Sequence, residues 1–341
     1  MNRSDASTGK RWSTRLKRIG LWVLGIIAGL AVLGGLYQVI GSALDRRAVS
    51  RPGQMVDVGG YEMYLYCTGE TQAGSPTVIL ETGLGSTSSV WARIQPEIAK
   101  ATRVCSYDRA GAGASDTSPE PRNAQHIAEE LHTLLQTAGV PGPYVLVGWS
   151  YGGLYIREYA GLYGDEVAGL VLVDSSSADQ WIGSPEREAK FRSNSLTFRL
   201  APFLVRLGLM RLIGLLQPDS GLPDSFDREL AASFAANKDW DTQSAEFLAS
   251  QESMTQVKEA HFREDMPLAV LSATEHGTPP EEEQLWQNWQ TQMAALSTNS
   301  VHYAVEGADH ASFWREPEAI QICIDAILSV VEAARSGAPL P

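Results

Sequence analysis

One serine stands between two glycines at the end of an apolar run. The stretch Gly148-Trp149-Ser150-Tyr151-Gly152 follows the pattern Gly-x-Ser-x-Gly. A serine at the tip of a sharp strand-to-helix turn needs small neighbours two positions before and after it, and glycine provides them. A helix that begins at such a turn also presents backbone N–H groups to a developing oxyanion. The pattern predicts that Ser150 is a nucleophile. The simpler alternative is a tight turn without chemistry.

This interpretation requires a strand before Ser150 and a helix after it. The run YVLVGW at 144–149 has the apolar character of a buried strand, and the stretch that follows is helical in character. Six other apolar runs predict strands at 61–67, 77–82, 102–108, 169–174, 268–273 and 301–306. Stretches with helical spacing lie between them, including 123–139 and 316–335. Alternating apolar strands and helices predict a mostly parallel sheet with helices on both faces.

One long interval, residues 175–266, interrupts the alternation. It contains no convincing strand, but it has several amphipathic stretches such as 198–216. An interval of this length is too long for a loop inside a compact domain. We therefore expect a helical insertion.

Three further stretches add to the Gly-x-Ser-x-Gly pattern. LETGLGSTSSVW (80–91) is similar to a loop that supplies an oxyanion donor after a third strand, and YDRAGAGAS (107–115) is similar to a loop after a fourth strand. Together these features resemble the α/β-hydrolase superfamily, whose members often carry a cap domain where the insertion lies. The resemblance implies the α/β-hydrolase fold with an eight-stranded, mostly parallel sheet. The implied divisions are a core of residues 53–174 and 267–335 and a helical cap of residues 175–266.

The resemblance also implies a catalytic triad in the chain order serine, acid, histidine. His310 lies in the loop between the last predicted strand and the last predicted helix, where the superfamily places its general base. His276, in the loop after the strand at 268–273, is the competitor for this role. The other histidines are His126 and His132 on a predicted helix before the serine, His261 in the insertion and His302 at the start of a strand.

Two residues remain open as the triad acid. Related enzymes usually place an aspartate after the seventh strand, where this sequence has His276 with Glu275 one position earlier. Asp174 ends the predicted strand at 169–174, and some lipase-like members take their acid from that strand. Either Asp174 or Glu275 would accept the Nδ1–H of His310 and stabilise the imidazolium.

The oxyanion hole is expected from two backbone N–H groups. One belongs to Tyr151, the residue after the nucleophile, and the other is assigned to Leu84, which follows Gly83. Donors of this kind contribute about 10²–10³ each to the rate of acyl transfer.

A long uncharged segment near the N-terminus predicts a membrane anchor. Residues 19–40 contain no charged side chain, and 22 helical residues are long enough to cross a hydrocarbon core of about 30 Å. Six Lys or Arg residues precede the segment and three Arg residues follow it. The positive-inside rule then places a basic tail, residues 1–18, in the cytoplasm and the main domain across the membrane. A cleaved signal peptide is the alternative, but its apolar core is shorter, about 7–15 residues.

Charge and motif content argue against several other classes of protein. The formal net charge is −13, and residues 52–341 alone carry −20, so nucleic-acid phosphates would be repelled. The glycines at 83–88 and 111–116 do not complete Gly-x-Gly-x-x-Gly, and the three cysteines lack zinc-binding spacing. We expect no nucleic-acid partner, no cofactor and no metal.

The strand order that the resemblance implies makes the second and fourth strands antiparallel neighbours. Cys67 and Cys105 lie on these two predicted strands. The resemblance therefore implies a disulfide between them, which the compartment beyond the membrane would permit. Two buried free thiols are the alternative, and Cys323 is expected in the core of the last helix.

The resemblance implies a membrane-anchored serine hydrolase of the esterase or lipase type. Ser150 would attack the substrate, His310 would transfer the proton, and water would hydrolyse the acyl-enzyme. Epoxide hydrolases and dehalogenases of this fold use a carboxylate nucleophile instead. An inactive binding protein and a cofactor-independent haloperoxidase-like enzyme remain alternatives. Apolar residues in 198–216 favour a small lipophilic ester as substrate, unless they pack on the core.

Overall fold

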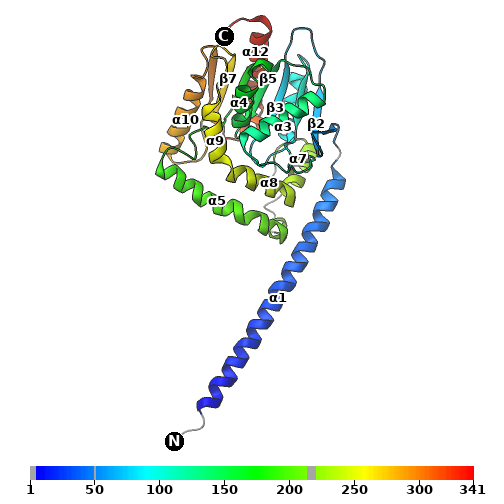
Figure 1. The fold of residues 1–341 in the computed structure, drawn as a ribbon, viewed down its shortest axis with the longest axis vertical. Helices are drawn as coiled ribbons and strands as arrows, with labels where there is room; N and C mark the ends of the chain where they lie inside the picture. Colours follow the sequence, from blue (N-terminus) through cyan, green and yellow to red (C-terminus); the bar gives the residue numbers. More distant parts are fainter. Residues whose placement is uncertain (1–4, 50, 213–219) are drawn as a thin grey trace.

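A single eight-stranded sheet forms the centre of the molecule (Figure 1). The computed structural model describes residues 5–49, 51–212 and 220–341. The strands are β1 (Gln54–Asp57), β2 (Glu62–Thr68), β3 (Thr77–Glu81), β4 (Val104–Tyr107), β5 (Tyr144–Trp149), β6 (Val167–Val173), β7 (Leu268–Ala273) and β8 (Ser300–Val305). Their order is β1-β2-β4-β3-β5-β6-β7-β8, and all pairs are parallel except β1 with β2 and β2 with β4. The predicted eight-stranded, mostly parallel α/β fold is confirmed.

The central strands are apolar on both faces because helices cover both. Along β3, Val78 and Leu80 contribute to one apolar core, while Ile79 between them contributes to the other. The helices over the two faces are α2 (Gln95–Ile98) and α12 (Pro317–Ser336) on the first side and α3 (Ala124–Thr137), α4 (Gly152–Leu162) and α10 (Pro280–Ala294) on the second. Three short segments complete the α/β domain around the sheet: the 3₁₀ turns η1 (Ser88–Trp91) and η2 (Gly164–Glu166), and the helix α11 (Ser312–Arg315).

The edge strand β1 was not located by the sequence patterns, although seven of the eight strands were. Only Val56 of its four residues is buried, so the strand shows no apolar run. An edge strand with one solvated face lacks the continuous apolar signal of a central strand.

The described part of the insertion between β6 and β7 consists of helices and the loops that join them. Its helices are α5 (Pro185–Arg206), α6 (Leu209–Leu212), α7 (Asp224–Phe234), α8 (Asn237–Leu248) and α9 (Ser250–Glu259). Helix α9 packs on α3 and α4 of the core, and α5 packs on α8. The end of the predicted amphipathic stretch, residues 213–216, lies outside the described residues.

The N-terminal helix α1 (Asp5–Ala48) extends well away from the domain (Figure 1). Its segment Arg15–Asp45 is long and apolar enough to cross a membrane, and an apolar stretch of 18 residues within it is not buried inside the protein. The helix continues on both sides of the predicted span of residues 19–40. The residues expected to form a basic tail are therefore helical from Asp5 onward.

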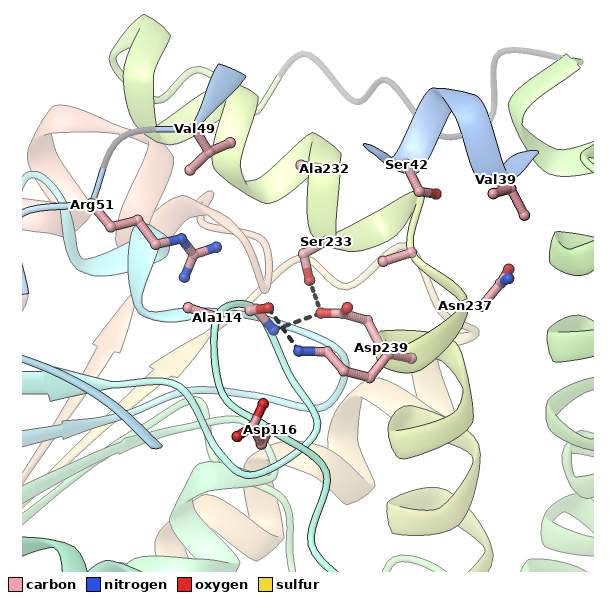
Figure 2. Close-up of a pocket in the computed structure, with 13 residues that line it drawn as sticks. Val39, Ser42, Val49, Arg51, Ala114, Asp116, Ala232, Ser233, Asn237 and Asp239 are labelled. Carbon is pink, nitrogen blue, oxygen red and sulfur yellow. Dashed lines mark hydrogen bonds between the residues drawn. The ribbon is translucent and has the colours of Figure 1, made fainter. Parts of the chain in front are cut away.

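The last part of α1 lies against the insertion instead of ending in a free linker. Gln38 is buried and donates its Nε2–H to the Ala235 carbonyl at 2.5 Å. A hollow of about 600 Å³ remains where α1 meets α7, α8 and the loop after β4 (Figure 2). Figure 2 shows Ser233 and Asp239 pointing toward each other at its edge, and they are hydrogen-bonded. Ser150, Asp174 and His310 do not line this hollow.

The disulfide between Cys67 and Cys105 is present. The two residues lie directly opposite each other on the antiparallel strands β2 and β4. Cys323 is a buried free thiol on α12, as expected.

Candidate active site

Ser150 occupies a strained turn between β5 and α4. Its φ is +58°, and its backbone N–H donates to the Val173 carbonyl at 3.0 Å, which fixes the turn against β6. A Cβ at Gly148 would lie 2.6 Å from the backbone of Gly152, and a Cβ at Gly152 would lie 2.8 Å from the Glu81 carbonyl oxygen. Glycine is therefore required on both sides of Ser150, as the pattern predicted.

Asp174 is the other strained residue. Within the part of the chain that the structure describes, Ser150 and Asp174 are the only non-glycine residues with positive φ, at +58° and +41°. Such conformations are unfavourable by about 1–3 kcal/mol each and occur most often at functional sites. Asp174 directly follows β6, the neighbour of β5 in the sheet, so the carboxyl ends of two adjacent strands carry both residues.

The carboxylate of Asp174 is fully buried and contacts His310. His310 Nδ1 lies 2.5 Å from Asp174 Oδ2. Trp286 Nε1 and the Ala273 N–H donate to the other oxygen, Oδ1, at 2.8 and 3.1 Å. Four hydrogen-bond donors, including one from His276, thus surround this buried carboxylate.

Glu275 is not brought to His310. Its side chain is exposed, its backbone N–H donates to the Ala308 carbonyl at 2.9 Å, and among the described residues its carboxylate makes no hydrogen bond to His310. Of the two acids that the sequence left open, the structure places Asp174 beside the predicted base.

His310 lies beside the turn that carries Ser150. The indole Nε1 of Trp149 donates to the His310 carbonyl at 3.0 Å, and the two rings are 4.9 Å apart. The imidazole remains 38% exposed, which leaves room for a reacting group. Ser150 Oγ has no hydrogen-bond partner among the described residues, and catalytic hydrogen bonds often form only when substrate is bound.

A second imidazole extends the network beyond Asp174. His276 Nε2 lies 2.8 Å from Asp174 Oδ2, and its Nδ1 lies 3.0 Å from Glu283 on α10. Burial lowers the pKa of His276, but the hydrogen bonds and charges of Asp174 and Glu283 outweigh burial and raise it to about 9. His276 is therefore an imidazolium at neutral pH. Sequence reasoning considered it only as a rival base, because residues 276 and 283 gave no sign that they meet.

The charge state of Asp174 follows from the same contacts. Burial alone raises the pKa of Asp174, but hydrogen bonds from His276 and His310 and their charges lower it below its ordinary value. The carboxylate is ionised at neutral pH, as an acceptor for the His310 Nδ1–H requires.

Two backbone N–H groups near Ser150 are available as oxyanion donors. The N–H groups of Leu84 and Tyr151 have no acceptor within the described residues. Arg109 donates to the Thr82 and Gly83 carbonyls at 2.7 and 2.9 Å. In a trans peptide the C=O and the following N–H point in opposite directions, so the Gly83 carbonyl directs the Leu84 N–H away from Arg109.

Arg109 is a functional candidate that the sequence reasoning missed. It is fully buried and also pairs with Glu81 at 2.6 Å and with Glu246 of α8 at 2.9 Å. The arginine in YDRAGAGAS was the only available signal, and nothing in the sequence showed which carboxylates it would meet. Asp108 and Asp116 hold loops in place: Asp108 accepts from the Ser88 N–H and Asp116 from the Glu62 N–H.

The remaining histidines lie outside this network. His126 and His132 are on α3, where His132 stacks on Tyr163. His302 is bonded to Ser272 across β7 and β8, and His261 is exposed after α9.

Comparison with known proteins decides the family. A family model described as "Alpha/beta hydrolase family" matches residues 78–320, which is more than half of the chain. The chain belongs to the alpha/beta hydrolase family.

Individual relatives of this alpha/beta hydrolase are distant. A protein of Hormonema carpetanum named "Probable transporter efuK" is 25% identical over 83% of this chain, which spans only 43% of that relative's length. A solved structure of the epoxide hydrolase CorEH has a TM-score of 0.64 at 16% identity, covering 82% of this chain and 98% of that chain. A thermophilic esterase from Thermogutta terrifontis has a TM-score of 0.60 at 22% identity, covering 82% and 99%. At these identities the two structures establish the shared fold alone.

An apolar cluster connects the Ser150 turn of this alpha/beta hydrolase to its helical insertion. Tyr151, Trp181 and Phe247 are buried in it, and Leu84 and Phe198 pack against it. Phe198 of α5 stacks on Phe247 of α8 with ring centroids 3.9 Å apart. Both residues with available N–H groups, Leu84 and Tyr151, therefore border an apolar environment.

A hollow of about 450 Å³ lies at the other end of the network. The residues that line it include His276, Trp286 and Trp289, together with Lys190 and other residues of α5. The ligand atoms of Asp174, His276 and His310 lie within 4.8 Å of one another, a spacing that could hold a metal ion. Here the two imidazoles are instead hydrogen-bonded to the carboxylate directly.

Proposed function

We propose that this protein is a serine hydrolase that cleaves ester bonds through an acyl-enzyme on Ser150. The observation that carries the proposal is the hydrogen bond between His310 and the buried, ionised Asp174, next to the strained turn that presents Ser150. A serine hydroxyl is a weak nucleophile and needs such a base.

The steps follow from this geometry. His310 Nε2 removes the proton of Ser150 Oγ as the oxygen attacks the ester carbonyl, and Asp174 stabilises the imidazolium that forms. The N–H groups of Leu84 and Tyr151 donate to the developing oxyanion. His310 then protonates the leaving alcohol, and a water molecule activated by the same imidazole hydrolyses the acyl-enzyme.

The substrate class is inferred from the surroundings of Ser150. The cluster of Tyr151, Trp181, Phe198 and Phe247 offers aromatic and apolar surface beside the donors. Ligand pockets that are mostly apolar with few polar groups favour apolar substrates. We assign a small lipophilic ester, with an acyl chain longer than acetyl.

The location of the enzyme is part of the proposal. Helix α1 is long and apolar enough to cross a membrane, and Lys and Arg are in excess on its N-terminal side. This charge asymmetry favours a single-pass protein with its N-terminus in the cytoplasm and its catalytic domain on the other side. Residues 175–266 would then form a cap close to the bilayer.

Acyl-chain profiles of the full chain in detergent test the proposal. We expect faster hydrolysis of medium-chain p-nitrophenyl esters than of acetate, and covalent labelling by a fluorophosphonate probe. Ser150→Ala should abolish both, whereas Ser336→Ala, an exposed serine at the end of α12, should abolish neither.

The possible outcomes separate the alternatives. A wild-type chain that binds no probe and hydrolyses no ester would indicate a binding protein on this fold. Labelling at Ser150 with a preference for acetate or for charged esters would retain the serine mechanism and remove the lipophilic substrate.

A further inference from the structure

Helices α5 and α6 expose an unusual amount of apolar surface. Outside α1, nine large apolar side chains are strongly exposed among the residues whose burial the structure describes. Six of the nine lie in α5 and α6. We refer to these six as the α5–α6 apolar face: Leu196, Leu200, Phe203, Leu204, Leu209 and Leu212.

The spacing on α5 makes this a continuous surface on one side of the helix. Positions 196, 200, 203 and 204 fall on one side of a helix with 3.6 residues per turn. The opposite side holds Ala201 and Val205, which are buried, and Phe198, which stacks on Phe247. Helix α5 therefore has two apolar sides, and only one of them is used within the protein.

Arginines line one edge of the exposed side. Arg192, Arg199 and Arg206 are spaced seven residues apart and are all exposed. Arg192 and Arg206 form surface ion pairs with Glu188 and Asp241. An apolar helix side with Arg or Lys at its border is the pattern of helices that lie in the interfacial region of a bilayer.

The contact between α1 and the insertion fixes the depth of this face. A Cβ at Gly34 would lie 2.1 Å from the Leu207 carbonyl oxygen, so α1 touches the end of α5 there. Arg211 of α6 pairs with Asp45 of α1 at 2.7 Å, beyond the apolar segment. Gly34 lies six residues before Ile40, the end of the predicted membrane span, or about 9 Å along the helix axis. This matches the depth of about 5–10 Å at which interfacial helices insert.

We propose that the α5–α6 apolar face inserts into the interfacial layer of the bilayer that α1 crosses. The inference rests on the proposed membrane crossing of α1. Figure 1 shows α5 on the side of the domain from which α1 extends. The opposite side of α5 packs in the cluster that contains Tyr151, so a single helix separates the lipid from the surroundings of Ser150.

Lipid-quenching of a fluorophore at three positions tests this proposal in the full chain. Single cysteines replace Phe203 on the face, Leu30 in the middle of the α1 segment, and Leu296 as the control. Leu296 is 43% exposed, and the next residue, Ser297, bonds to the Met266 carbonyl just before β7, at the amino-terminal end of the parallel strands and opposite to the end where Asp174 follows β6. Each variant is labelled with an environment-sensitive fluorophore and reconstituted into phosphatidylcholine vesicles. The parent chain, whose free thiol Cys323 is buried, gives the background.

We expect lipids brominated near the headgroup end of the acyl chain to reduce the Phe203→Cys emission at least about twofold and to leave Leu296→Cys unchanged. Lipids brominated near the methyl end should quench Leu30→Cys most. Quenching at position 30 without quenching at position 203 would overturn the inference while the anchor stands. No quenching at position 30 would instead refute the membrane crossing itself. A blue-shifted, unquenched label at 203 that cross-links to a second copy would mean that the face is a dimer interface.

Discussion

The carboxylate of Asp174 accepts hydrogen bonds from two imidazoles through the same oxygen atom. His310 and His276 lie 2.5 and 2.8 Å from Oδ2. A buried carboxylate with this many donors is held in one orientation, because any rotation would leave a buried polar atom unsatisfied. The orientation of His310 depends on this single group.

Replacing Asp174 should remove most of the activity. In Asp174→Asn the amide holds His310 in the wrong tautomer, and we expect kcat to fall by a factor on the order of 10⁴, as in serine proteases. Glu275→Gln is the matched control and should retain activity within about threefold, because surface changes away from such contacts usually matter little. Steady-state kinetics on a p-nitrophenyl ester measure both. A larger loss in Glu275→Gln would transfer the role of acid to that residue.

His276 should set the acidic limit of activity. With a pKa of about 9, His276 is positively charged at neutral pH, and its ring lies 6.2 Å from that of His310. A fixed positive charge this close to the site opposes the addition of further positive charge there. In His276→Gln we expect the acidic midpoint of the kcat/KM profile to rise by roughly 0.5–1 pH unit, since one charge at this distance acts through a partly solvated site.

A pH–rate profile from about pH 5 to 9 measures this shift. Gln keeps a hydrogen-bond donor toward Asp174. If the role of His276 is purely structural, His276→Gln changes the rate by the same factor at every pH and leaves the midpoint in place. A midpoint that stays in place, or moves to lower pH, would rule out the electrostatic role.

At the scale of elements, the turn between β5 and α4 is specified by close backbone contacts. Gly152→Ala places a methyl group 2.8 Å from two carbonyl oxygens of the strand β3 and its following residue, Glu81 and Thr82. We expect a loss of about 1–3 kcal/mol in stability, the usual cost of overpacking, together with reduced activity. Gly164→Ala is the control, because nothing lies within 4 Å of its Cβ position. Urea denaturation and esterase assays compare the two variants.

The same turn shows how far a sequence can predict a site. Ser150 was predicted from glycine spacing, which is a local signal, and His310 from the chain order that the resemblance implies. Asp174 and Glu275 stayed open because both follow strands of the same sheet, and only the fold shows which side chain faces inward. The pairs Arg109–Glu246 and His276–Glu283 join separate elements, and no periodicity links them. For 198–216, the sequence left open whether the apolar residues pack on the core or border the substrate, and it could not show which of them the protein covers.

At the scale of the whole molecule, the disulfide closes a loop of 38 residues between β2 and β4. A cross-link of this length restricts the unfolded chain, and its removal costs typically 2–4 kcal/mol. We expect Cys67→Ser with Cys105→Ser to lower the free energy of unfolding by that amount while kcat changes little, since the pair lies away from Ser150 in the strand order. Chemical denaturation with and without a reductant checks this, and Cys323→Ser is the control. Equal stability of the two chains would show that the disulfide is dispensable.

If the proposed function holds, the anchoring of the insertion bears on the path by which substrates and products would move. Helices α8 and α9 are tied to the core by Glu246 on Arg109, Lys238 on the Gly113 carbonyl and Glu252 on Asn123. Separating Glu246 from Arg109 would leave the buried carboxylate of Glu246 without its nearest charged partner, at a cost of about 3–5 kcal/mol.

Helix α5, by contrast, is tied to α10 by the exposed Lys190–Glu282 pair, which contributes about 0–1 kcal/mol. Helix α5 also packs on α8, where Phe198 stacks on Phe247, but the ion pairs that it makes within the described residues are all exposed. Opening beneath α5 would break apolar contacts and no buried ion pair, so we propose it as the route of access. Under the proposed function, an ester entering there would come from the side on which α1 stands, and its fatty acid and alcohol would leave in the same direction. We therefore expect such an enzyme to exchange its apolar reactants with the bilayer and to take only the water of the hydrolysis step from solution.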